Sequence, residues 1–279
     1  MVNDKKTIVI TGASDGIGAE AAEQLKRDDV RLVLIGRSPS KMESVAESVG
    51  TPNYHIADFS VLDDVRRLAD ELLTNYDCID VLSNNAGGLF SGPIKTVDGF
   101  EKTFQVNHLA PFLLTHLLFD RLMTSQALIV NTASIGARLF SKLDLNDINT
   151  FNNFTPNRAY GNGKLANILF TRGLEKRFSN QGISSIAFHP GNVATSFASD
   201  TTSYFKWVYH TALKNFLITP QQGGQNLKRF LDPHNRNQWI SGTYYNEKGK
   251  PSRTHRLAYD DSIVEAHWRK SCELLDISW

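Results

Sequence analysis

The sequence predicts a doubly wound α/β fold, in which a parallel sheet of about seven strands carries helices on both faces. Short runs of β-branched and aliphatic residues alternate with segments of helical periodicity along the chain. This order forms βαβ units, whose right-handed crossovers bury a parallel sheet between helices. The 279 residues contain no linker, repeat or low-complexity tract, so one domain over residues 1–279 is the economical interpretation.

The expected elements cover almost the whole chain. Strands are expected at residues 7–10, 32–35, 54–57, 79–83, 127–130, 185–188 and 243–245. Helices are expected at residues 17–27, 39–49, 62–76, 99–123, 159–178 and 221–231. Pro39 supports the start of the second helix, because proline suits the first turn of a helix.

The composition is that of an ordinary globular protein and excludes several classes. With 41% hydrophobic residues, 21% charged residues and a formal net charge of +1, the chain is neither disordered nor basic enough for a broad grip on nucleic acid. Cys78 and Cys272 cannot form a disulfide framework and fit free thiols in a reducing compartment. The eight histidines show no spacing typical of a metal site.

The hydropathy pattern indicates neither a signal peptide nor a membrane anchor. The first residues lead directly into the first expected strand. The longest apolar region, residues 109–123, is interrupted by polar side chains and is too short to span a bilayer. We therefore expect a soluble, cytoplasmic protein.

A glycine-rich loop, Thr11-Gly12-Ala13-Ser14-Asp15-Gly16-Ile17-Gly18, connects the first strand to the first helix. Glycines let a pyrophosphate approach the backbone, and the helix N-terminus offers it N–H groups and a positive dipole end. The Gly-x-x-x-Gly-x-Gly spacing alone also fits a structural turn. Its position after the first strand favours a dinucleotide site in a Rossmann fold.

The end of the second strand indicates which dinucleotide binds. NAD enzymes place an acidic residue there to bind the ribose hydroxyls, whereas this chain has Gly36-Arg37-Ser38. A guanidinium beside a hydroxyl suits a ribose 2′-phosphate, so NADP(H) is favoured over NAD(H). The alternative is that Arg37 is a solvated loop cation. Asp15 is also an unfavourable charge so close to phosphates.

Tyr160 and Lys164 form a candidate acid–base pair. They lie four residues apart in an expected helix and therefore share one face. A nearby ammonium lowers the pKa of a phenol, which is otherwise about 10. Ser134 follows the fifth strand, at the edge of the sheet where ligands bind in doubly wound folds. The alternative for Tyr160 and Lys164 is an ordinary surface pair.

These features resemble the short-chain dehydrogenase/reductase family over nearly the whole chain. The matching pieces are the glycine loop, Asp58, Asn84-Asn85-Ala86-Gly87, Asn107, Ser134, Tyr160-x-x-x-Lys164 and Pro190-Gly191. Residues 106–109, 164–170 and 189–191 look most like the retinol dehydrogenase-like branch, which includes WW-domain oxidoreductases. That branch usually prefers NADP.

The resemblance implies roles for individual residues. Tyr160 would be the general acid in reduction and the base in oxidation, with Lys164 lowering its pKa and binding the nicotinamide ribose. Ser134 would hold the substrate carbonyl oxygen, and Asn107 would help to hold a water that relays protons to Lys164. The implied cofactor-binding residues are Gly12, Ser14, Asp15, Gly16, Ile17, Gly18, Arg37, Asp58, Phe59, Asn85, Ala86, Gly87, Tyr160, Lys164, Pro190, Gly191, Val193 and Thr195.

The substrate side is less informative. The aromatic-rich segment 197–217 fits either a mobile lid over an apolar substrate or a helix packed in the core. The polar insert at residues 139–158 is expected to border the site. The two glycines between Tyr160 and Lys164 are unusual in a helix, and we expect them where the backbone approaches a ligand.

The leading function is an NADP(H)-dependent oxidoreductase that interconverts a carbonyl and an alcohol on a small, apolar substrate. The alternatives are a nonenzymatic NADP-sensing protein on the same fold and a lyase or epimerase that keeps its cofactor bound. The helices at residues 99–123 and 159–178 are rich in leucine and phenylalanine. Since the family commonly pairs these two helices, we expect a homodimer or homotetramer, although a monomer is also compatible.

Overall fold

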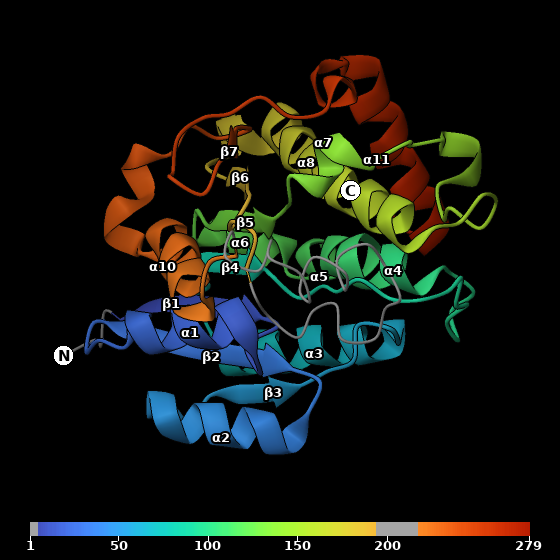
Figure 1. The fold of residues 1–279 in the computed structure, drawn as a ribbon. Coiled ribbons are helices and arrows are strands. Elements are labelled where there is room, and N and C mark those ends of the chain that lie inside the picture. The colour runs from blue at the N-terminus through green and yellow to red at the C-terminus, as the bar shows by residue number, and fades with distance from the viewer. Residues whose placement is uncertain (1–4, 194–216) are drawn as a thin grey trace.

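The seven strands form one parallel sheet in the order β3-β2-β1-β4-β5-β6-β7, which confirms the predicted fold class (Figure 1). The computed structural model describes residues 5–193 and 217–279. The strands are β1 (Lys6–Thr11), β2 (Val30–Gly36), β3 (Tyr54–Ile56), β4 (Val81–Asn84), β5 (Leu128–Thr132), β6 (Ser184–Phe188) and β7 (Tyr244–Tyr245). The strand order reverses beside β1, and ligands bind at such a switch point, beyond the carboxyl ends of the strands.

Helices cover both faces of the sheet. The α-helices of the described residues are α1 (Gly16–Leu25), α2 (Pro39–Val49), α3 (Leu62–Asn75), α4 (Lys102–Phe104), α5 (Ala110–Leu117), α6 (Phe119–Thr124), α7 (Gly136–Leu139), α8 (Pro156–Phe178), α10 (Pro220–Leu231) and α11 (Asp261–Leu275). A π-helical turn spans Gln105–Leu109, and 3₁₀ turns span Leu145–Asp147, Ser179–Gln181, Pro233–Gln238 and Arg256–Tyr259.

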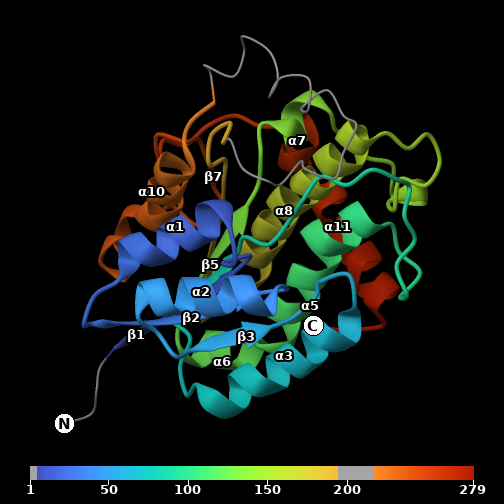
Figure 2. The same cartoon turned by 60° about the horizontal axis from the view of Figure 1, so that its bottom comes forward.

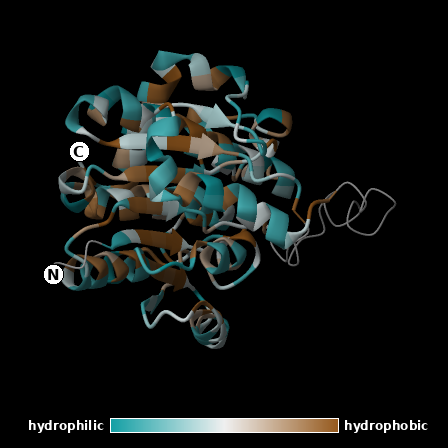
Figure 3. Ribbon diagram, turned by 90° about the vertical axis from the view of Figure 1, so that its left-hand side faces the viewer, coloured by the Kyte–Doolittle hydropathy of each residue, from teal (hydrophilic) through white to brown (hydrophobic). Residues whose placement is uncertain are grey.

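The apolar side chains of the strands divide between two cores. Along β1, Ile8 and Ile10 face the core beneath α1, α2 and α10, whereas Val9 faces the core beneath α3, α5 and α8. This follows from the two-residue period of a strand. The helices α1 and α10 lie side by side, as do α8 and α11 (Figures 1 and 2). Hydrophobic residues are prominent on the central strands, and hydrophilic residues on the outer helices (Figure 3).

The prediction of a single helix over residues 99–123 is wrong. Gly99 has φ +89°, which does not belong to a helix, and the Glu101 side chain caps the first turn by accepting from the Phe104 N–H. The chain then passes through the π-helical turn into α5. At Leu118, where φ is −89° and ψ is 0°, α5 gives way to α6.

The C-terminal helix α11 was not predicted from the sequence. Its buried positions, Val264, His267, Trp268, Ser271 and Leu275, have helical spacing. Three of these five residues, a histidine, a tryptophan and a serine, are not the aliphatic residues by which such a stripe is usually recognised. The Asp260 side chain caps the helix by accepting from the N–H groups of its first turn.

Helix α11 and the chain end cover the outer side of α5 and α8. The Trp268 ring lies 5.1 Å from Phe112 and 5.8 Å from Phe170, and Trp279 stacks 5.6 Å from Phe178. Aromatic side chains that suggested pairing between two copies are therefore packed within one chain. The homo-oligomer itself stays a prediction.

Among residues 5–193 and 217–279, no helix has the length and apolar character needed to cross a bilayer. No group of three histidine, cysteine or acidic side chains in the same ranges is arranged to hold a metal ion. The expected cytoplasmic location stays a prediction.

Trp268→Ala should lower the free energy of unfolding by ~3–5 kcal/mol, because the side chain is 4% exposed and packs directly on Gly173. Urea unfolding followed by circular dichroism measures the change. Val97→Ala is the control, since Val97 is 83% exposed, and it should change stability by less than about 0.5 kcal/mol. Equal losses in the two variants would show that α11 is not packed as described.

Candidate active site

The glycine loop makes a tight turn between β1 and α1. Gly12 and Gly16 have φ angles of +67° and +57°, in the region that favours glycine. A Cβ atom on Gly18 would lie 2.2 Å from the Gly12 carbonyl oxygen, so no larger residue fits where the helix starts. The turn leaves the N-terminus of α1 at the carboxyl end of the sheet, as a pyrophosphate site requires.

Thr11 and Asn85 tie this loop to the end of β4. The Thr11 hydroxyl donates to the Ser83 carbonyl and accepts from the N–H groups of Asn85 and Ala86. The Asn85 side chain donates back to the Thr11 carbonyl at 2.9 Å. These buried bonds hold the turns that follow the two neighbouring strands at one edge of the sheet.

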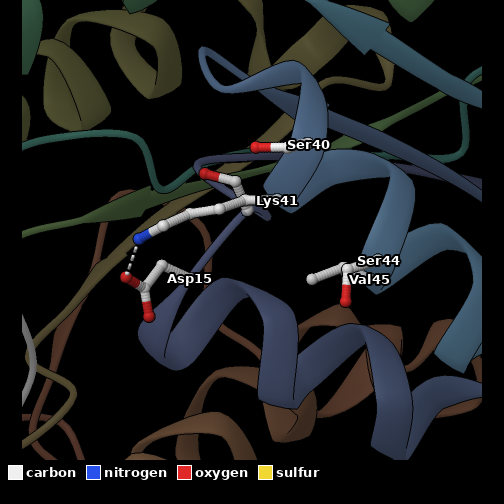
Figure 4. A pocket seen from close by; sticks show the side chains of 6 residues that line it. Asp15, Ser40, Lys41, Ser44 and Val45 are labelled. Carbon is white, nitrogen blue, oxygen red and sulfur yellow. Dashed lines mark hydrogen bonds and ion pairs between the residues drawn. The ribbon is translucent and has the colours of Figure 1, made fainter.

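An open hollow of about 330 Å³ lies between the N-termini of α1 and α2 (Figure 4). Ser14, Asp15, Ser40 and Lys41 are among its lining residues, and the Lys41 ammonium contacts the Asp15 carboxylate at 2.8 Å. Arg37 is exposed just before α2 and makes no ion pair with the described residues. Sequence reasoning missed Lys41, although its place in the first turn after Arg37 was a readable signal.

The other predicted cofactor residues of the described part of the chain also follow the carboxyl ends of strands. Asp58 follows β3, where its carboxylate accepts from the Ser60 N–H and hydroxyl, and the neighbouring Phe59 is buried. Val193 pairs with Ile218 across an isolated bridge. Thr195 and residues 197–216 of the predicted lid lie outside the described residues.

The residues Pro190 and Gly191 connect β6 to this bridge. The Pro190 carbonyl accepts from the Asn226 side chain of α10 at 2.9 Å, and Gly191 has φ +100°. A Cβ atom on Gly223 would lie 2.6 Å from the Ile17 side chain and 2.8 Å from that of Val193. The N-terminus of α10 therefore packs directly on the glycine loop and on the segment after β6.

Ser134 and Tyr160 meet at Gly136. A Cβ atom on Gly136 would lie 3.2 Å from the Tyr160 ring and 3.3 Å from the Ser134 Oγ atom. Both side chains are largely buried, at 8% and 7% exposure for Ser134 and Tyr160. The Ser134 Oγ accepts from the Gly136 N–H at 3.0 Å, which leaves its own proton available as a donor.

Lys164 lies on the same side of α8 as Tyr160, and its ammonium is 5.7 Å from the centre of the Tyr160 ring. It donates to the Thr132 carbonyl oxygen at 3.0 Å. A Cβ atom on Gly87 would lie 3.0 Å from this ammonium and 2.5 Å from the Asn107 Oδ1 atom, so both groups border one small space. Burial lowers the pKa of Lys164 from its ordinary value of 10.5 to about 7.

The Asn107 side chain is engaged mainly by backbone. Its Nδ2 donates to the carbonyls of Thr103 and Gly88, and its Oδ1 accepts from the Gly88 N–H. It therefore holds the segment after β4 in place. A carbonyl oxygen has two lone pairs, so Oδ1 keeps acceptor capacity for a water on the Lys164 side.

The glycines between Tyr160 and Lys164 serve protein packing. A Cβ atom on Gly161 would lie within 3.0 Å of the backbone of Gly136, Phe140 and Ser141, and one on Gly163 would lie 3.2 Å from the Asn107 Cβ. The expectation of a ligand at these two positions is corrected accordingly. Asn162 between them was missed as a structural residue.

Asn162 ties the predicted insert to α8. Its Oδ1 accepts from the Ser141 hydroxyl and the Lys142 N–H, and its Nδ2 donates to the Thr150 hydroxyl. Because Asn162 lies between Tyr160 and Lys164, these buried bonds hold the insert beside the site.

The residues present fit a dinucleotide cofactor. The positive-φ glycines leave the backbone open to a pyrophosphate, and Arg37 and Lys41 place two cations beside the hollow at the end of β2. Fold and site together define an oxidoreductase of the NAD(P)-dependent class.

The chain belongs to the short-chain dehydrogenase family, whose model matches residues 6–204. Retinol dehydrogenase 12 of Mus musculus is 36% identical over 98% of this chain and 87% of its own length. A Streptomyces sp. (strain C5) protein named for a daunorubicin C-13 ketoreductase, DnrU, is 34% identical over 87% of this chain and 83% of its own. The crystal structure of an uncharacterized protein from Mycobacterium paratuberculosis is similar with a TM-score of 0.78 and 28% identity, covering 98% of this chain and 94% of that one.

These relatives place the chain in the retinol dehydrogenase branch of the family. The protein is therefore a short-chain dehydrogenase/reductase that acts on CH–OH or carbonyl groups with an NAD(P) cofactor.

The depressed pKa of Lys164 should appear in the pH dependence of stability. Between pH 7 and 10.5 the unfolded chain holds the Lys164 proton and the folded protein has released it, so stability rises with pH across this window. Compared with Lys164→Met, the wild-type free energy of unfolding should gain up to ~1.4 kcal/mol per pH unit there. Urea unfolding of both proteins from about pH 6 to about pH 9 tests this. A constant difference would show that the ammonium keeps an ordinary pKa.

Proposed function

We propose that this protein is an NADP(H)-dependent oxidoreductase that interconverts a carbonyl and an alcohol, with Tyr160 as the acid–base group. The observation that carries the proposal is the meeting of Ser134, Tyr160, Lys164 and Asn107 beyond β4 and β5, beside the glycine loop. We also propose that residues 1–279 act as one NADP-binding unit.

In reduction, the Ser134 hydroxyl donates a hydrogen bond to the substrate carbonyl oxygen and holds that oxygen beside Tyr160. Tyr160 then gives its phenolic proton to that oxygen as it gains charge, and in oxidation it takes the proton back. The bound nicotinamide supplies or accepts the hydride. The Ser134 Oγ atom and the Tyr160 ring both border the space at Gly136, which supports a shared position for one substrate oxygen atom.

Lys164 supports this proton transfer in two ways. Its charged form stabilises the phenolate of Tyr160 at a distance of 5.7 Å from the ring. Because its own pKa is about 7, it also accepts and releases a proton at neutral pH with little free-energy cost. A water held by Asn107 Oδ1 would return protons to Lys164 from solvent.

The substrate is proposed to be a small, apolar carbonyl compound or alcohol. One relative is named for retinol, an apolar alcohol, and another for a ketone of daunorubicin. The first name agrees with an apolar alcohol as substrate, and the second with a ketone.

Arg37→Ala should weaken the binding of NADPH far more than the binding of NADH. Loss of a charge-assisted contact of ~1.5–3 kcal/mol corresponds to a rise in the NADPH Kd of about 10- to 100-fold. Fluorescence titration with both nucleotides measures this. Arg66→Ala, which removes an exposed cation from α3, should change neither Kd. If Arg37→Ala weakened the binding of both nucleotides equally, Arg37 would not contact the 2′-phosphate.

Tyr160→Phe should reduce turnover by ~10²–10⁴-fold, because it removes the general acid and keeps the ring. NADPH oxidation across a panel of aldehydes, ketones and quinones provides the assay, and NADPH affinity should stay within about twofold. Tyr54→Phe on β3 is the matched control and should keep the wild-type rate. If the Tyr160→Phe protein kept most of the wild-type rate, the proposed role of Tyr160 would be wrong. A wild-type protein that binds NADPH without multiple turnovers would favour the sensor.

A further inference from the structure

A chain of buried polar side chains connects Lys164 to the C-terminal helix α11. The Thr132 carbonyl oxygen accepts from the Lys164 ammonium at 3.0 Å and from the Asn167 Nδ2 at 3.2 Å. The Asn167 Oδ1 lies 3.4 Å from the His108 Nδ1, and the His108 Nε2 lies 3.0 Å from the Ser271 Oγ. All five residues are buried, so this series of contacts runs through the interior from the site to the far side of α8.

The direction of every bond in this chain is determined at one end. A carbonyl oxygen can only accept, so Asn167 must present its NH₂ group to Thr132 and its Oδ1 to His108. His108 must then carry its proton on Nδ1 and accept at Nε2 from the Ser271 hydroxyl. The reverse direction would place two acceptors against each other at Thr132.

His108 is neutral in this setting. It is fully buried among the rings of Phe104, Phe112 and Phe170, and burial holds its pKa well below the ordinary value. Among the described residues, the only other titratable ring against it is His267 of α11, at 4.7 Å, whose pKa is lowered to about 3 by burial. A neutral imidazole with one N–H is a directional group, which can donate on one side and accept on the other.

Buried polar groups are costly unless they are hydrogen-bonded, and apolar side chains of similar size would fill the same space without that requirement. Their presence in an aromatic core therefore points to a role, and Lys164 indicates which. Its bond to Thr132 is the only hydrogen bond that it makes to the described residues. Whatever orients the Thr132 carbonyl therefore orients the ammonium.

We propose that His108 is a positioning residue for Lys164. It acts through Asn167 and the Thr132 carbonyl, and Ser271 of α11 anchors its outer nitrogen. The consequence for turnover rests on the proposed function, whereas the hydrogen-bond direction does not. By donating from Nδ1, His108 holds Asn167 in the amide orientation that the Thr132 carbonyl requires, in which Asn167 and Lys164 share one acceptor, and α11 thereby becomes part of the support of the site.

The first test needs neither cofactor nor activity. In protein labelled with ¹⁵N-histidine, the His108 ring should be neutral near pH 7 with its proton on Nδ1, and its signals are assigned by their loss in His108→Asn. A proton on Nε2, or a charged ring, would overturn the proposal.

The second test separates positioning from packing. His108→Phe keeps the ring and removes both nitrogens, while His108→Asn keeps a donor near the Nδ1 position. We expect kcat to fall at least tenfold in His108→Phe with KM within about twofold, and to recover at least partly in His108→Asn. A loss of packing alone would lower the melting temperature of both variants and leave kcat unchanged, and that result would contradict the proposal.

A double-mutant cycle with Asn167→Leu is the third test. It can be carried out with His108→Asn if the His108→Phe protein does not fold. Asn167→Leu interrupts the series of hydrogen bonds between His108 and Thr132, and it should lower kcat about as much as His108→Phe does. Combined with either His108 variant it should cause little further loss, because both changes act through Thr132. Additive losses would contradict a shared path. If the wild-type protein shows no turnover, the proposed function fails, and the tautomer measurement still decides the direction of the chain.

Discussion

The arrangement of the site depends on one hydrogen bond, from the Lys164 ammonium to the carbonyl oxygen of Thr132. A buried ammonium is costly unless an acceptor faces it, and this one has no carboxylate partner among the described residues. Thr132, the last residue of β5, must therefore turn its carbonyl oxygen toward α8. That requirement sets the position of α8 against the sheet, and with it the position of Tyr160.

The strands, the loops after them and the residue types of the site could be predicted from the sequence because each depends on local chemistry. Apolar runs of the right length form buried parallel strands whatever surrounds them, and the Gly12 loop needs conformations that only glycine adopts freely. Since ligands bind beyond the carboxyl ends of parallel strands, Ser134 was expected at that edge, and the family resemblance placed Asn85 and Tyr160 in the same site. The structure brings Ser134 and Tyr160 together at Gly136.

The missed features depend on contacts between distant residues. The helix expected over residues 99–123 is interrupted because Glu101 caps a later start and because Asn107 bonds to Gly88, 19 residues before it in the sequence. Helix α11 carries His267 and Ser271 on its buried side, where Ser271 hydrogen-bonds to His108 and the His267 ring packs 4.7 Å from the His108 ring. No periodicity in the sequence records such a partner.

The Asp15 carboxylate shows how a local conflict in the sequence is resolved in space. Beside a phosphate site its charge is unfavourable, which counted against the dinucleotide interpretation of the loop. In the structure Asp15 accepts from the Gly16 N–H at the start of α1 and contacts the Lys41 ammonium at 2.8 Å. Both groups are about half exposed, so the pair contributes little to stability. Its effect is electrostatic and local: the Lys41 charge offsets that of Asp15 and leaves Arg37 as the unpaired cation at the end of β2 among the described residues.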